Sequence, residues 1–182
     1  MPFLKSLPEN AGPPAIFDKY PDLYGPWSQM SQALMNGPSP LSQGERELVL
    51  AFAAGTAGCT FVYVAHSEVA YRWGIEEGLL DRLLENLESA PTGQRLKSLL
   101  AFVRKLILSP IQLTQADAEI VLAAGWDEHA LHDAIAITGR AAFMQRLVEG
   151  FGFVPMSKEA ARKRAEKRVQ LGYIDLYAKK EH

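Results

Sequence analysis

The chain has almost no cysteine: Cys59 is the only one among its 182 residues. A single cysteine cannot form a disulfide within the chain, which excludes the disulfide-stabilised scaffolds typical of small secreted proteins. The first residues, Met-Pro-Phe-Leu-Lys-Ser-Leu-Pro-Glu, also lack a basic region followed by a long apolar run. We therefore expect no signal peptide, and a cytoplasmic protein is the default expectation.

An excess of charge is missing too. The net charge is −2, which gives no general attraction to nucleic acid or to an anionic membrane. The densest basic stretch, residues 158–168, carries six Lys or Arg against Glu159 and Glu166. We interpret it as the solvated face of a terminal helix, because no nucleic-acid motif accompanies it. With 48% apolar and 22% charged residues, the chain is typical of one globular domain.

The longest uncharged run, residues 48–65, has eighteen residues and stands at the lower limit for a membrane span. It is rich in Ala, Gly and Thr, and Gly55 and Gly58 interrupt it. Two buried helices that meet at these glycines explain the run better. We therefore expect no membrane-spanning segment.

The chain also lacks any segment of sustained two-residue alternation, so we predict an all-α fold. Residues 1–14 contain four prolines and are expected to form an extended arm. Ser42 and Glu45 have the spacing of a capping box. The expected helices cover residues 15–35, 43–56, 59–73, 75–87, 92–108, about ten residues from Thr114 to Gly125, a segment from Asp127 to Gly150, and residues 157–177.

Three polar residues stand out around the uncharged run. Glu47 lies twelve residues before Cys59, and His66 lies seven residues after it. A thiol near a helix N-terminus gains from the positive end of the helix dipole, His66 can exchange a proton near neutral pH, and a hairpin would bring Glu47 back toward His66. Nucleophile, base and orienting acid form a catalytic arrangement. Each residue also has a plain alternative: a buried packing cysteine, a hydrogen-bonded core histidine and a first-turn helix acid.

This pattern resembles a known family. The signature Glu-x11-Cys-x-x-Cys-x3-His belongs to the alkylhydroperoxidase D-like branch of the carboxymuconolactone decarboxylase superfamily, and Glu47, Cys59 and His66 match three of its four positions. Residues 34–47, 113–125 and 141–153 are similar to the uncharacterised peroxidase-related subgroup, so the resemblance covers roughly residues 15–155. The second cysteine is replaced by Val62.

The resemblance implies an all-helical domain over residues 15–155 with a core helical hairpin, and a homo-oligomer (dimer, trimer or hexamer) with active sites near subunit contacts. Residues 156–182 would be a C-terminal helix that packs on the domain or on a neighbouring subunit. Active members reduce hydroperoxides by thiol–disulfide cycling without a cofactor or metal. By this resemblance Cys59, His66 and Glu47 are the catalytic residues, with His66 and Glu47 relaying protons.

Val62 leaves three outcomes open, because valine cannot form a disulfide with an oxidised Cys59. Cys59 alone could reduce a small hydroperoxide and be regenerated by an external thiol reductant, which would make this an alkylhydroperoxidase-like antioxidant protein. The pocket could instead serve non-redox chemistry of the carboxymuconolactone decarboxylase type. The protein could also be an inactive, ligand-binding oligomer.

Two histidines and two arginines elsewhere in the chain are further candidates. His129 and His132 lie near acidic residues at helical spacing, but they do not suggest a full set of metal ligands, so we expect a solvated first helical turn and no metal. Arg140 and Arg146 lie in an apolar segment, and an Arg there needs a partner, such as an acid near the thiol site or on another subunit. The three tryptophans are predicted to be core or interface residues: Trp27, Trp73 and Trp126.

Overall fold

A computed structural model describes residues 1–176 of the chain, and within that range every regular element is a helix. The predicted all-α fold is confirmed. The elements are α1 (Pro13–Lys19), α2 (Pro21–Asn36), α3 (Gln43–Thr56), α4 (Thr60–Arg72), α5 (Leu79–Glu85), α6 (Gln94–Leu108), the 3₁₀ turn η1 (Pro110–Gln112), α7 (Gln115–Ala123), α8 (Glu128–Phe151) and α9 (Lys158–Leu171).

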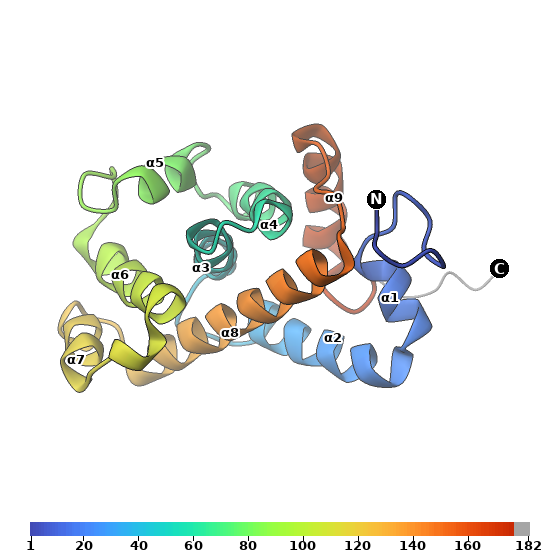
Figure 1. The fold of residues 1–182 in the computed structure, drawn as a ribbon. Coiled ribbons are helices and arrows are strands. Elements are labelled where there is room, and N and C mark those ends of the chain that lie inside the picture. The colour runs from blue at the N-terminus through green and yellow to red at the C-terminus, as the bar shows by residue number, and fades with distance from the viewer. Residues whose placement is uncertain (177–182) are drawn as a thin grey trace.

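The helical hairpin of α3 and α4 is the centre of the fold (Figure 1). The capping box starts α3 as predicted: the Glu45 backbone N–H donates to Ser42 Oγ (3.2 Å), and the Ser42 N–H donates to Glu45 Oε2 (2.8 Å). The chain reverses at Gly58, whose φ of +74° lies in the left-handed region that favours glycine. The Cys59 N–H then donates to the carbonyl of Ala54 (2.9 Å), which closes the turn before α4.

Helix α3 is buried on all sides, because α4, α6 and α8 surround it (Figure 1). Residues 48–54 are each at most 1% exposed. An α helix that is apolar all round is typical of a position inside a core, and this burial explains the uncharged run. Among the described helices, none is long and apolar enough to cross a membrane.

Three boundaries differ from prediction. The helix expected over residues 15–35 is two helices, because Tyr20 precedes Pro21 and is held out of helical geometry (φ −128°, ψ 63°). The helix expected over residues 75–87 shrinks to α5, since Gly74 and Gly78 both have positive φ. The last helix ends at Leu171, where Gly172 turns with φ +69°, and the Tyr177 end expected for it lies outside the described residues.

The two ends of the described chain meet on one side of the fold. Helix α9 lies along α4, and α1 and the N-terminal residues lie near the end of α8 (Figure 1). Pro13 and Pro14, expected in the extended arm, form the first turn of α1, where a missing N–H costs no helical hydrogen bond. The expected homo-oligomer stays a prediction.

The turn at Gly58 yields a matched pair of substitutions. A Cβ at Gly58 would meet no atom within 4 Å, so Gly58→Ala adds only the strain of its positive φ. We expect this variant to lower the free energy of unfolding by about 1–2 kcal/mol in urea titrations. Gly139→Ala, inside α8 and also without neighbours within 4 Å, should raise it by about 0.5–1 kcal/mol. Equal effects at the two positions would contradict the description of the turn.

Candidate active site

The hairpin brings two of the predicted site residues into direct contact. Glu47 on α3 and His66 on α4 are 2% and 5% exposed, and Glu47 Oε2 lies 2.7 Å from His66 Nδ1. An antiparallel hairpin allows this contact because it brings residues before the turn side by side with residues at a similar distance after it. The pair therefore lies inside the protein and is held by its two most central helices.

Burial sets the charges of this pair. Burial lowers the pKa of His66 to about 4, and the attraction of Glu47 only partly offsets it. Burial also acts to raise the pKa of Glu47, but His66, Arg168 and Tyr173 outweigh it and leave that pKa below its ordinary value. We infer that near pH 7 an ionised Glu47 accepts the Nδ1–H of a neutral His66. The lone pair of His66 then lies on Nε2.

A third group completes the carboxylate environment. Tyr173 donates its hydroxyl to Glu47 Oε1 (2.5 Å), and its ring lies parallel to the His66 ring with centroids 6.4 Å apart. Burial, and then the charge of Glu47, raise the pKa of this phenol, so it stays protonated. Both carboxylate oxygens of Glu47 thus accept a hydrogen bond. Sequence reasoning missed Tyr173, although its position directly after Gly172 marks a chain turn.

Two arginines enclose the tyrosine ring. The guanidinium carbons of Arg140 and Arg168 lie 4.7 Å and 4.4 Å from the Tyr173 ring centroid, within the range of cation–π attraction. Arg140 also donates from Nε to Ser31 Oγ (3.1 Å) and lies over the Trp27 ring. These contacts of Arg140 are with a hydroxyl and two aromatic rings, and an acidic partner for it stays a prediction. Arg146 is exposed and donates to the carbonyl of Ala142.

A cavity of about 230 Å³ opens beside His66. Its charged wall consists of Arg164 and Arg168 from α9, and its apolar wall includes the side chains of Phe61, Val62, Ala65, Met144, Val154 and Met156. Val62 and His66 are four residues apart on α4, so they share one helix face. The position at which the resemblance places a second cysteine therefore faces the cavity and carries a valine.

Cys59 lies elsewhere. It is the N-cap of α4 with φ −84° and ψ 89°, so it is outside the helix and need not share the face of His66. It is 1% exposed and is not among the described residues that line the cavity. Burial raises its pKa to about 11, Glu149 adds to that effect, and the backbone N–H groups of Val62 and Phe61 only partly oppose it. Near neutral pH it is a thiol.

The other candidates take structural positions. His129 and His132 lie 3.5 Å and 2.9 Å from the buried carboxylate of Asp133. Among the residues that the structure describes, no group of three or more His, Cys, Asp or Glu side chains is arranged so that it could hold a metal ion. Trp126 is buried and donates to the carbonyl of Arg95 (2.8 Å), while Trp73 is only half-buried.

Comparisons with known proteins point to one fold. No protein-family model and no curated protein sequence matches the chain. Among solved structures, the alkylhydroperoxidase AhpD core of an uncharacterized peroxidase-related protein from Ralstonia eutropha JMP134 superposes with a TM-score of 0.73 at 22% identity, over 81% of this chain and 78% of that one. An uncharacterized peroxidase-related protein from Silicibacter sp. TM1040 gives 0.70 at 22% identity, over 86% and 93%. The chain therefore has the alkylhydroperoxidase D-like helical fold.

The neutral state of His66 predicts how stability depends on pH. In the unfolded chain His66 has its ordinary pKa of 6.5, and in the folded protein about 4. Between these values only the unfolded chain binds the proton, so the free energy of unfolding falls as pH falls, by up to about 1.4 kcal/mol per pH unit. In urea titrations between about pH 7 and pH 5, the free energy of unfolding of His66→Gln should therefore depend less on pH than that of the wild type.

The pH range separates His66 from its neighbour. The pKa of Glu47 is lowered from an ordinary value of 4.5. The stability that ionised Glu47 contributes is therefore fully present above that pH, and it is lost only as pH falls further. Identical slopes for the wild type and His66→Gln above about pH 5 would show that His66 is not a buried neutral group.

Proposed function

We propose that this protein is an acid–base enzyme of the non-redox, carboxymuconolactone decarboxylase-like type that acts on a small organic anion. One observation carries the proposal: His66, held by Glu47, lines a cavity together with Arg164 and Arg168, whereas the only cysteine does not. The helical hairpin holds the Glu47–His66 pair in place, and the cavity offers space for a substrate beside it.

The cavity walls favour an anion with an apolar body. Arginine side chains recognise carboxylates through paired, charge-assisted hydrogen bonds. Phe61, Met144 and Met156, which also line the cavity, offer aromatic and flexible apolar surface. A compound with a carboxylate at one end and an aromatic or aliphatic group at the other matches both walls, and the volume of about 230 Å³ limits it to a small molecule.

His66 is the group that would move a proton. Its Nδ1 is engaged by Glu47, which leaves Nε2 to accept a proton from a carbon beside the substrate carbonyl. In that step the C–H bond breaks, an N–H bond forms, and the electron pair moves to the carbonyl oxygen as an enolate. The imidazolium, stabilised by the Glu47 carboxylate, then returns the proton to carbon.

Substrate binding would itself make His66 a stronger base. Burial is the main cause of the low pKa of His66, and the positive charges of Arg168 and Arg140 lower it further. A bound carboxylate offsets these charges and therefore raises the pKa of His66 toward neutrality. A general base with a pKa near the working pH is the most effective. Without substrate, His66 is thus neutral, and with a bound carboxylate its higher pKa makes proton transfer to it more favourable.

Hydrogen–deuterium exchange at carbon tests this reaction. Phenylpyruvate has a carboxylate, an aromatic ring and an acidic C–H next to a carbonyl. We expect the protein to accelerate deuterium incorporation from D₂O above the buffer rate, as followed by proton NMR. His66→Gln should lower the rate by about 100-fold or more, and Arg164→Gln should raise KM by about tenfold or more through loss of a charge-assisted bond.

Two controls make the result specific. Lys163→Gln removes a positive charge from the same helix at a residue that pairs with Glu159, and it should keep the wild-type rate. Cys59→Ala should also keep it. Exchange at the buffer rate with the wild-type protein, or a loss of exchange in Cys59→Ala that equals the loss in His66→Gln, would contradict the proposal.

A thiol-dependent peroxidase based on Cys59 is the second candidate. It is supported by the position of Cys59 at the start of α4, where the N–H groups of Val62 and Phe61 act to lower the thiol pKa. In this reaction the thiolate attacks the peroxide O–O bond and forms a sulfenic acid with release of an alcohol, and two equivalents of external thiol reduce it back. Burial opposes this candidate, because it keeps the sulfur protonated.

Thiol reactivity separates the two candidates. A pKa of about 11 leads us to expect that Cys59 reacts with a thiol-specific dye at neutral pH at least about tenfold more slowly than free cysteine, whose pKa is about 8.5. Peroxide consumption with dithiothreitol should stay at the buffer rate. A dye reaction that titrates well below pH 8.5, together with peroxide turnover lost in Cys59→Ser, would establish the peroxidase instead.

A further inference from the structure

The chain beyond α9 reaches back into the core through one turn. Gly172 ends α9 with φ +69°, and a Cβ there would lie 2.4 Å from Gln32 Oε1. The Tyr173 N–H donates to that same oxygen (2.6 Å). Only glycine therefore fits both the backbone conformation and the space, and the turn directs Tyr173 into the interior, where it is 1% exposed.

Tyr173 fixes the carboxylate on which His66 depends. Its hydroxyl holds Glu47 Oε1 while His66 holds Oε2, so the carboxylate cannot rotate without breaking a buried hydrogen bond. A buried acceptor that loses its partner costs about 1–3 kcal/mol. The orientation of Glu47, and through it the Nδ1–H form of His66, is therefore tied to a residue 126 positions away in the chain.

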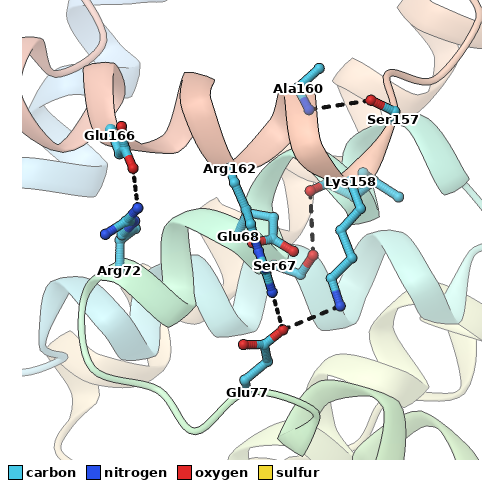
Figure 2. A network of polar contacts seen from close by, with 10 residues as sticks. Ser67, Glu68, Arg72, Glu77, Ser157, Lys158, Ala160, Arg162 and Glu166 are labelled. Atoms are coloured by element: carbon cyan, nitrogen blue, oxygen red, sulfur yellow. Dashed lines mark hydrogen bonds and ion pairs between the residues drawn. The ribbon is translucent and has the colours of Figure 1, made fainter.

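Ion pairs help to attach α9, the helix that precedes Tyr173, to α4 and to the segment that follows it. Figure 2 shows Arg162 of α9 reaching both Glu68 (3.0 Å) and Glu77, with Lys158 also on Glu77 (3.3 Å). Farther along, Arg72 of α4 pairs with Glu166 of α9 (Figure 2). The buried residues of α9 are Ala161, Ala165 and Arg168. Two of these side chains are single methyl groups, so they bury little apolar area. Glu68 is buried, whereas the pairs of Glu77 and the pair of Arg72 with Glu166 are exposed and therefore weaken with salt.

We infer that Tyr173 is a positioning residue for the Glu47–His66 pair, and that docking of α9 on α4 controls whether it reaches Glu47. The inference deepens the proposed function, because it concerns the base of that reaction. Helix α9 also supplies Arg164 and Arg168 to the cavity wall. Its docking therefore assembles the anion-binding wall and orients the base in a single step.

The His66 ring itself gives the test, independent of any activity. Charged groups reach it from three elements: Glu47 on α3, Arg140 on α8 and Arg168 on α9. Removal of the Tyr173 hydroxyl leaves the Glu47 carboxylate with one donor fewer, so it stabilises a protonated His66 more strongly. In Tyr173→Phe we therefore expect the pKa of His66, followed by NMR of its ring nuclei, to rise by about half a unit or more.

A matched substitution controls for loss of a tyrosine hydroxyl. Tyr63 lies on α4, and its hydroxyl also donates to a carboxylate, that of Asp81. Tyr63→Phe should leave the titration of His66 unchanged. A His66 titration in Tyr173→Phe that equals the wild type would overturn the inference. Failure of the deuterium-exchange assay with an intact pKa change would instead overturn only the proposed reaction.

Docking is tested by variants that leave the site residues in place. Arg162→Gln removes the pairs with Glu68 and Glu77, and should move the His66 titration in the same direction as Tyr173→Phe. Lys163→Gln changes the net charge equally but breaks a pair within α9, and should have no effect. In wild-type protein at about 1 M NaCl, amide exchange at Tyr173 should quicken at least about threefold relative to α3. Salt-independent exchange, or equal effects of the two variants, would overturn control by docking.

Discussion

The doubly held carboxylate of Glu47 is the interaction on which the rest of the site depends. A buried carboxylate is costly unless hydrogen bonds and opposite charge compensate it. Here His66 and Tyr173 each donate to one oxygen, and Arg168 adds positive charge. The residues that satisfy Glu47 come from α4 and from the chain beyond α9, so one buried charge joins the central hairpin to the C-terminal segment. It also engages only one ring nitrogen of His66, a residue that lines the cavity.

Under the proposed function, Val62 goes with a use of this framework that differs from that of a two-cysteine site. Val62 and His66 share the face of α4 that lines the cavity, whereas Cys59 is buried at the N-cap and keeps its proton. The cavity beside the histidine therefore combines apolar side chains with two arginines, Arg164 and Arg168. Such a cavity favours recognition of an organic anion and proton transfer to and from carbon. The proposed reaction therefore differs from peroxide reduction, although the fold is that of the peroxidase-related structures.

The sequence predicted the features that depend on local chain chemistry. The capping box at Ser42, the turn at Gly58 and the uncharged run were enough to predict the hairpin, and the hairpin geometry led to the contact between Glu47 and His66. Tyr173 could not be found in this way, because its partner is 126 residues away and no periodicity links them. The direction of the Cys59 side chain was also hidden: an N-cap residue is not helical, so helical spacing to His66 does not place it on the same face.

A structure of the protein with bound benzoate tests the central claim most directly. Benzoate has a carboxylate for the arginine wall and a ring for the apolar wall, and it carries no reactive group. We predict that its carboxylate contacts Arg164 or Arg168, that its ring lies against Phe61 and Met144, and that His66 keeps Nδ1 on Glu47 and turns Nε2 toward the ligand. A cavity that holds only water at saturating benzoate, or a His66 ring turned away from it, would contradict the account.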